Sequence, residues 1–487
     1  MSEAENPRPP TLLEATISLL SLIIGIGTSI ALFGMDPHIP MLLGVFVASL
    51  IALRCGFSWK TIETGMLNGI SNAMQAMIIL LIVGVLIGVW ILSGVVPTLI
   101  YYGLETLSPQ IFLPTALLIC ALTSLATGTS WGTTGTIGVA LMGVGAGLGL
   151  PLPVVAGAVL SGAYFGDKMS PLSDTTNLAP AMVGTDLFTH IRHMMYTTAV
   201  SFGLTIVIEI VLSWQLSAGA GDLGQINLIL ETLDQNFTIS PILLIPPVLV
   251  MVVSYRKVPA IPGIAIGALS AALLAIVMQG SGYQDLVSAA FGGYVADTGV
   301  EDVDSLLSRG GLESMLYTIS LVIVAMMFGG VMERTGQLRV VADRILQRAK
   351  STGSLVFSTV LTAIGANLVL CDQYMAIVMA GRMYPEAYRE RGLHPKNLSR
   401  AVEDSATVTA NLVPWNSGGA YQAATLGVAT LAYLPFNFFC WLSPIVTVIF
   451  GMFGWTMHKL DPATAGELAT PEATEPTKPE PDRPEPA

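Results

Sequence analysis

The sequence predicts an all-α polytopic membrane protein made of two inverted repeats, with re-entrant hairpins and two interrupted transmembrane helices. Three observations lead to this fold class. Only 11% of the 487 residues are charged and 53% are hydrophobic, whereas soluble domains average about 25% charged residues. The pattern Asp-x2-Ser/Thr-x3-Asp/Asn begins at residue 167 and again at residue 404, 237 positions later. Where a loop of one half is basic, the loop at the matching place in the other half is not basic.

Each half is predicted to contain the same series of elements. At roughly 20 residues per span, the apolar stretches fit about ten to thirteen membrane segments. In order, we expect two helices (11–33 and 39–55; 238–255 and 261–279), a polar connection, a third helix (74–96; 314–332), a hairpin pair (111–150; 354–384), an interrupted helix (153–185; 400–427) and a last helix (193–214; 435–457).

The charges of the loops predict that the two halves have opposite orientations. Loops 334–350 and 382–400 each hold five Lys or Arg residues, and their counterparts near 97–110 and 145–153 hold none. Because basic loops stay in the cytoplasm, we expect both termini and these two loops there, and segments 97–110, 215–237 and 280–313 outside. The predicted units are therefore a cytoplasmic N-terminus (1–10), a first repeat (11–214), an external linker (215–237), a second repeat (238–459) and a disordered cytoplasmic tail (460–487).

The tail and the cysteines say little about function. Residues 460–487 are rich in Pro, Glu, Ala and Thr, so they have little apolar surface to bury. They carry much of the net charge of −12. The four cysteines lack metal-ligand spacing and are expected to be small buried residues without disulfides.

Four segments are polar where a membrane helix should be apolar: 127–136, 166–177, 365–373 and 403–419. Irregular backbone at membrane depth needs cover from protein or a water-filled cavity, so 127–136 and 365–373 are predicted as re-entrant turns. Helix packing through small residues is the alternative for 127–136, and a cytoplasmic loop is the alternative for 166–177. Pro171 should break its helix and free backbone carbonyls for a cation. Asp167, Ser170 and Asp174 would share one helical face.

These segments supply an acidic candidate site, and no Arg is expected in the middle of a membrane span. Ionisable residues inside a membrane indicate function by default, and oxygen ligands without Arg suit a small hard cation such as Na+. Lys168 is the charge partner, expected to pair with Asp167. Asp372 has the alternative role of capping a half-helix. The candidate cation and proton ligands are Asp167, Asp174, Asp404, Asp372, Ser130, Thr133, Ser170, Thr407, Asn367 and Asn411, with sodium placed at Asp174 and Asp404.

At these residues the chain resembles the NhaC family of Na+/H+ antiporters. The resemblance rests on Gly128–Gly135, on Gly166–Asn177 and on the segment from Glu403-Asp404 to Trp415-Asn416, and it covers residues 11–459. It implies inverted repeats, hairpins, and scaffold and transport domains. Similar sequences include malate/lactate antiporters, so the resemblance does not fix the substrate.

The expected function is exchange of Na+ for H+ by alternating access at the repeat interface. A buried carboxyl group has a raised pKa, and a bound cation would expel its proton. A Na+- and H+-coupled organic-anion antiporter, such as malate against lactate, is the alternative.

Two other classes are disfavoured. An intramembrane aspartyl protease is disfavoured because its motifs are missing, and a channel is disfavoured because the polar breaks suggest a closed site. We expect no enzyme activity, no cofactor beyond the transported Na+ and H+, and no nucleic-acid partner. The expected location is the inner cell membrane, with a homodimer left open.

Overall fold

The computed structural model describes residues 7–33, 35–217 and 223–460, and their secondary structure consists of helices joined by short loops, with two isolated β-bridges. The predicted tail after residue 460 lies outside the described residues. The first half comprises α1 (Leu12–Phe33), α2 (His38–Arg54), α3 (Trp59–Asn72), α4 (Met74–Leu92), α5 (Val95–Thr106), α6 (Pro109–Thr127), α7 (Ser130–Thr133), the π-helix η1 (Thr134–Gly138), α8 (Val139–Gly147), α9 (Leu152–Met169), α10 (Asp174–Val183) and α11 (Leu187–Ser217).

The second half contains more and shorter elements than the first. It follows α12 (Leu223–Asn236) and comprises η2 (Pro241–Leu244), α13 (Ile245–Tyr255), α14 (Ala260–Gln279), α15 (Tyr283–Gly292), α16 (Glu301–Leu307), η3 (Glu313–Met315), α17 (Leu316–Arg334), α18 (Gln337–Leu346), α19 (Thr352–Leu370), α20 (Gln373–Met383), α21 (Pro385–Glu390), α22 (Pro395–Val402), the π-helix η4 (Glu403–Thr407), η5 (Ala410–Leu412), α23 (Ser417–Leu426), α24 (Thr430–Tyr433), η6 (Leu434–Phe436) and α25 (Phe438–Phe453).

The structure confirms an all-helical membrane protein with broken helices. Seven helices of the described part are long and apolar enough to cross a membrane, and nine if each of two bent helix pairs is one span. This count is below the ten to thirteen segments expected from the sequence. The difference arises because the hairpins and interrupted helices consist of pieces such as α10 and α20, which have 10 and 11 residues and are shorter than a span.

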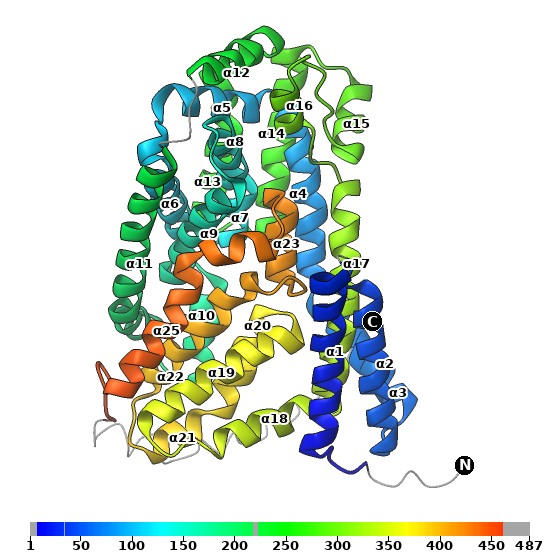
Figure 1. Ribbon diagram of the computed structural model, residues 1–487, viewed down its shortest axis with the longest axis vertical. Helices are drawn as coiled ribbons and strands as arrows, with labels where there is room; N and C mark the ends of the chain where they lie inside the picture. The colour runs from blue at the N-terminus through cyan, green and yellow to red at the C-terminus, as the bar shows by residue number, and fades with distance from the viewer. Residues whose placement is uncertain (1–6, 34, 218–222, 461–487) are drawn as a thin grey trace, which may run out of the picture.

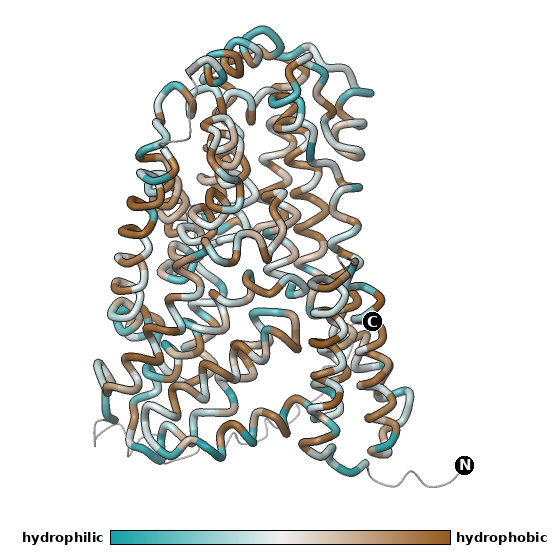
Figure 2. Tube along the Cα trace, in the orientation of Figure 1, coloured by the Kyte–Doolittle hydropathy of each residue, from teal (hydrophilic) through white to brown (hydrophobic). Residues whose placement is uncertain are grey.

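Corresponding elements of the two halves lie toward opposite ends of the molecule. Figure 1 places α5, α8 and α12 at the upper end, and α18 and α21 at the lower end. The hairpin of α6 to α8 approaches the middle from above, and the hairpin of α19 and α20 approaches it from below (Figure 1). Hydrophilic segments gather at both ends, and the long helices between them are hydrophobic (Figure 2).

The two halves are packed through each other rather than side by side. α2 and α3 of the first half pack on α17 of the second, and α14 packs on α4. The predicted polar connection before α4 is in fact the helix α3, whose first turn is capped because Ser58 accepts a hydrogen bond from the Thr61 amide. A Cβ at Gly69 would lie 2.1 Å from the Met326 carbonyl oxygen, so only glycine permits this close approach of α3 and α17.

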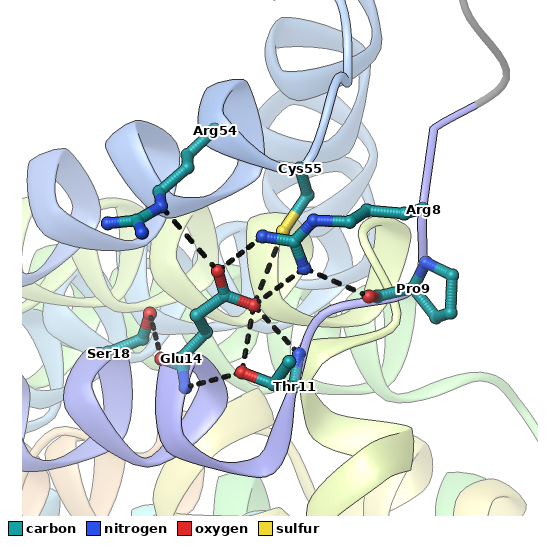
Figure 3. A network of polar contacts seen from close by, with 7 residues as sticks. All are labelled: Arg8, Pro9, Thr11, Glu14, Ser18, Arg54 and Cys55. Atoms are coloured by element: carbon teal, nitrogen blue, oxygen red, sulfur yellow. Dashed lines mark hydrogen bonds and ion pairs between the residues drawn. The ribbon is translucent and has the colours of Figure 1, made fainter.

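A polar network fixes the first described residues to the end of α2 (Figure 3). The Glu14 carboxylate accepts hydrogen bonds from the Thr11 amide at 2.8 Å and from Arg8 Nη1 at 2.9 Å. The Arg8 amide donates to the Cys55 carbonyl at 3.0 Å. At the other end of the described chain, the Leu460 amide donates to the Gly392 carbonyl at 2.8 Å. Cys55 and the other three cysteines are buried and free, as predicted.

Candidate functional site

The tip of the first hairpin is a tight turn at Gly128. This residue has φ of +73°, which glycine adopts readily, and Thr129 then caps α7 by accepting from the Gly132 amide at 3.2 Å. The rest of the predicted turn is helical, with residues 130–138 in α7 and the π-helix η1. Helix is tolerated there because the Thr hydroxyls donate to carbonyls one turn back, as Thr133 does to Thr129 at 2.9 Å. π-helices of this kind are frequent at functional sites.

The first acidic motif lies at a break between two helices, as predicted. α9 ends at Met169 and α10 begins at Asp174, with Pro171 in the gap. The expectation that Asp167 and Asp174 share one helical face is therefore wrong, because the helix stops between them. Asp167 is buried, whereas Asp174 is exposed at the start of α10.

The carbonyls freed at this break already have protein partners. The Thr176 hydroxyl donates to the carbonyls of Asp167 and Lys168 at 3.2 and 3.0 Å, and the Asn177 amide group donates to the Pro171 carbonyl at 3.0 Å. Backbone oxygens are thus less available to a cation than the sequence suggested. The side-chain carboxylates are the remaining strong ligands.

Asp167 joins the break in α9 to the first hairpin tip. Its Oδ2 accepts a hydrogen bond from the Ser130 hydroxyl at 2.6 Å and another from the Ser130 amide at 3.1 Å. Two residues that lie 37 positions apart in the chain, both predicted as site residues, are therefore in direct contact. The amide comes from the first residue of α7, where backbone N–H groups favour a negative charge.

Lys168 forms an ion pair with Asp404, not with Asp167 as expected from the sequence. Nζ of Lys168 contacts Oδ1 of Asp404, and both side chains are 0% exposed. Lys168 also donates to the Ser443 hydroxyl at 2.9 Å and lies over the Phe439 ring, 5.5 Å from its centre. The pair joins the first acidic motif to the second. It depends on how α9 and η4 approach each other, which spacing along the chain does not reveal.

Two hydroxyls complete the surroundings of Asp404. Its Oδ2 accepts from the Thr197 hydroxyl of α11 at 2.7 Å and from the Thr447 hydroxyl of α25. Thr197, Thr447 and Ser443 were missed in the sequence, because isolated hydroxyls on membrane helices usually serve packing. The pair is thus enclosed by α9, α11, α25 and η4.

Glu403 is a second carboxyl group that the candidate set did not contain. It is 0% exposed, and neither of its oxygens has a hydrogen-bond partner within the described residues. The charges of Lys168 and Asp167 lie near it. Its position next to Asp404 was the available signal, but the preceding Arg400 suggested that it lay near the surface. Arg400 is instead buried and donates to the Thr456 hydroxyl at 2.6 Å.

The second hairpin tip is built around Asp372, which caps α20. Its Oδ1 accepts from the amides of Tyr374 and Met375 at 2.9 and 3.0 Å, and its Oδ2 accepts from the Ser417 hydroxyl at 3.2 Å. This geometry is the capping role expected as the alternative for Asp372. Cys371 beside it has a left-handed φ of +57° and closes the turn.

The remaining predicted residues hold the broken helices together. Asn367 donates to the Ala406 carbonyl at 2.6 Å and ties the second hairpin to η4. Asn411 accepts from Asn437 at 2.6 Å. Thr407 is buried, and its hydroxyl lacks a hydrogen-bond partner among the described residues.

Tyr374 marks where the carboxylates converge. The charges of Asp174, Asp167 and Asp372 all act on its ring hydroxyl, and the residue is 40% exposed. Ionisable groups at membrane depth face protein or water rather than lipid. Asp174 and Tyr374 are thus exposed, whereas Asp167, Glu403 and the Lys168–Asp404 pair are buried.

A cleft of about 360 Å³ lies between α3 and α17, beside the second hairpin. It is lined by Gly65, Asn68, Ser71, Asn72, Gly330, Glu333 and Arg334. None of these is a predicted site residue, and Asn72 contacts Met375 of α20 at 3.7 Å. The cleft is thus separate from the buried pair.

Comparison with known proteins places this chain among antiporters. The model of the Na+/H+ antiporter family matches residues 162–455, which include both acidic motifs. The chain is 39% identical to the Na(+)/H(+) antiporter NhaC of Alkalihalophilus pseudofirmus, over 91% of this chain and 96% of that one. It is 40% identical to the malate-2H(+)/Na(+)-lactate antiporter of Bacillus subtilis, over 92% and 96%. It is 37% identical to the arginine/ornithine antiporter ArcD of Halobacterium salinarum, over 94% and 95%.

Proposed function

The chain belongs to the Na+/H+ antiporter family that includes NhaC, and from this premise we propose that it exchanges Na+ for H+ at the Lys168–Asp404 pair. It is a multi-pass secondary antiporter and not an enzyme. Exchange across the cell membrane by alternating access is the finer proposal. The observation that supports it best is a fully buried ion pair where two interrupted helices meet.

Charge balance explains how this pair would couple two ions. Lys168 and Asp404 together are neutral, and both are removed from water. An additional cation would leave an uncompensated positive charge in a medium of low dielectric, which is costly. A Na+ ion can therefore bind to Asp404 only when a proton leaves the site. Na+ and H+ then exclude each other, as antiport requires.

The neighbouring groups suit the two bound states. When Na+ occupies Asp404, the hydroxyls of Thr197 and Thr447 already point at the same carboxylate and would serve as neutral oxygen ligands. When the site is protonated, Lys168 takes the place of the ion and keeps its bond to Ser443. Lys168 would act as a tethered cation that the transported cation replaces.

The other carboxylates form a route toward the pair. Asp174 is exposed, Asp167 is buried, and Glu403 is fully buried without a hydrogen-bond partner in the described structure. We propose that a cation passes from Asp174 to Asp167, and that Glu403 and Asp404 hold it. In this proposal Na+ binds Asp174 and Asp404 one after the other, and the two residues do not bind the same ion together. Movement of the hairpins relative to the packed helices would change the side that is open.

The direct test is proton flux in proteoliposomes that contain the purified protein and a pH dye. A Na+ gradient should drive proton movement in the opposite direction, and Asp404→Asn should abolish it. Glu105→Gln, which changes an exposed carboxylate of α5, is the control and should behave as the unmodified protein. Normal Na+-driven flux in Asp404→Asn would contradict the proposal.

An organic-ion antiporter is the second candidate, because the relative that exchanges malate for lactate is as similar as NhaC, at 40% against 39% identity. The same vesicles loaded with labelled malate, lactate, arginine or ornithine separate the two functions. Exchange of a labelled organic ion for another organic ion, in vesicles where a Na+ gradient alone moves no label, would favour the organic-ion antiporter. Location in the inner cell membrane, with both termini in the cytoplasm, and homodimer formation remain predictions.

A further inference from the structure

One ionisable side chain inside the membrane belongs to no part of the site described above. Glu209 lies on α11, is 0% exposed, and has no hydrogen-bond partner for either oxygen within the described residues. No described ion pair includes it. Burial of a carboxyl group without a partner is costly unless it carries a proton. Packing alone does not require such a residue.

The inner face of α11 is polar along most of its length. Its buried residues include His190, Thr197, Thr198, Ser201, Thr205, Glu209 and Ser213, whereas Val200, Leu204, Val207, Val211 and Trp214 are exposed on the opposite face. Apart from Thr198, these polar residues and the buried His193 recur every three or four positions, so they form one continuous stripe. The stripe faces protein, and the apolar side faces lipid.

This stripe connects the ion pair to the upper end of the molecule. At its middle, Thr197 donates to Asp404 at 2.7 Å. Twelve residues further along the helix, about 18 Å at 1.5 Å per residue, lies Glu209. One turn beyond, Ser213 donates to the Pro109 carbonyl at 2.8 Å, at the start of α6. α6 begins shortly after α5 ends at Thr106, and α5 lies toward the upper end of the molecule (Figure 1).

The hydroxyls between Glu209 and Asp404 keep acceptor capacity. Ser201 donates to the Thr197 carbonyl at 2.9 Å, and Thr205 donates to the Ser201 carbonyl at 2.8 Å. The Thr198 hydroxyl is buried without a partner in the described structure. Each hydroxyl therefore retains lone pairs that can accept a hydrogen bond, and successive hydroxyls lie about 6 Å apart along the axis.

Charged groups of the neighbouring helices do not compete for Glu209. α6 and α25 pack on α11 and contain no Asp, Glu, Lys, Arg or His; their titratable residues are Cys120 and Cys440. α9 contributes Tyr164, Asp167 and Lys168. α10 contributes Asp174, and α22 contributes Lys396 and Arg400. The charged residues among these lie at the middle or at the lower end, toward Asp404 rather than toward Glu209.

We propose that Glu209 is a second proton-binding site, which passes protons along the polar face of α11 between the Lys168–Asp404 pair and the α5–α12 end. In one direction, water at that end protonates Glu209, and Glu209 then releases a proton through water and hydroxyls to the pair. The carboxylate that remains is protonated again from the water. The cation uses the separate route past Asp174. This inference depends on the proposed function, because a proton route matters only if protons are exchanged.

The test compares Glu209→Gln with the unmodified protein in two measurements. In proteoliposomes, Na+-driven proton flux should fall about tenfold or more, because an amide cannot carry the proton. In detergent, stabilisation of the protein by Na+ should change less than twofold, because the cation ligands are intact. Asp404→Asn should lose both the Na+-driven proton flux and the stabilisation by Na+. Glu209→Asp keeps a carboxyl group and should recover part of the flux with a shifted pH profile.

Each outcome decides between the two proposals. Normal flux and a normal pH profile in Glu209→Gln would overturn the role of Glu209 and leave Na+/H+ exchange intact. If Glu209→Gln does not fold, an unchanged flux and pH profile in Glu209→Asp would overturn the same role. An unmodified protein that moves no protons with any cation or organic ion would overturn both. Loss of flux together with loss of Na+ stabilisation in Glu209→Gln would make the residue structural and also overturn it.

Discussion

Lys168 and Asp404 depend on each other for their charge, because neither is exposed to water. Their contact joins two segments that lie in different halves of the chain. Glu403, next to Asp404, is equally buried but has no partner within the described residues. The two neighbouring carboxyl groups therefore have different roles in the proposed cycle: one is balanced by a lysine, and the other is available to an ion.

Asp404→Asn should destabilise the protein as well as stop transport. The change leaves Lys168 as an uncompensated buried charge, and breaking such a pair costs about 3–5 kcal/mol. Adding Lys168→Met should recover most of the stability, because two neutral side chains remain, but it should not restore flux. Thermal unfolding in detergent and proton flux in vesicles measure the two effects. A double variant less stable than Asp404→Asn would show that the ion pair is not the cause.

Asp372→Asn should preserve transport, because Asp372 is a helix cap and Asn caps nearly as well as Asp. The Asn side-chain oxygen can still accept from the amides of Tyr374 and Met375. Asp372→Ala should lose the cap and about 1 kcal/mol of stability. Flux and thermal unfolding of both variants provide the check. Loss of flux in Asp372→Asn at normal stability would restore Asp372 as an ion ligand.

The carboxylates of the site could be predicted, but most of their partners could not. Asp167 and Asp404 stood out because a motif occurred twice in an apolar sequence. Thr197 and Thr447 gave no signal, because single hydroxyls on membrane helices are ordinary packing residues. The pairing of Lys168 with Asp404 arises from how two helix breaks meet, and such contacts depend on tertiary structure alone.

At the scale of elements, the first hairpin tip rests directly on the break between α9 and α10. A Cβ at Gly128 would lie 2.7 Å from the backbone carbon of Leu172, and the next turn brings Ser130 to Asp167. The sequence predicted the break from Pro171 and the turn from glycine. The predicted turn was too long, because the hydroxyls of Thr133, Thr134 and Thr136 donate to helix carbonyls instead of interrupting the helix.

Gly128→Ala should therefore impair transport beyond its effect on the backbone. The left-handed φ at Gly128 strains an alanine by roughly 1 kcal/mol, and the added methyl group also pushes the tip away from Leu172. Gly184→Ala is a matched control, because Gly184 has a φ of +76° at the end of α10 and no neighbour within 4 Å of the new methyl group. We expect similar or smaller loss of stability in the control and a clear loss of flux only in Gly128→Ala. Equal flux in the two variants would mean that contact between tip and break is not required.

At the scale of the whole molecule, the loops divide between two ends (Figure 1). Segments expected outside, such as α5, α12 and α16, lie at the upper end, and α18 and α21 lie at the lower end (Figure 1). The last described residues also lie at that end, since Leu460 contacts Gly392 after α21. Hydropathy alone could not assign this division, because the apolar runs of both halves are similar. The basic residues could, because most of them are concentrated in one set of loops, such as 334–350 and 382–400.

The side on which each end lies can be measured by cysteine labelling in whole cells. Gln235 of α12 and Gln347 after α18 are both exposed and lie in the two loop sets. All four natural cysteines are buried, so they should react slowly, and two single variants, Gln235→Cys and Gln347→Cys, form a matched pair. Because five basic residues lie in segment 334–350, we expect a membrane-impermeant maleimide to label Gln235→Cys in intact cells and Gln347→Cys only after permeabilisation.

The reverse pattern would place α18 outside, and Glu209 would then lie on the cytoplasmic side of the Lys168–Asp404 pair. Labelling of both residues from outside would show that the two loop sets are not on opposite sides of the membrane, and alternating access between inverted halves would fail with it.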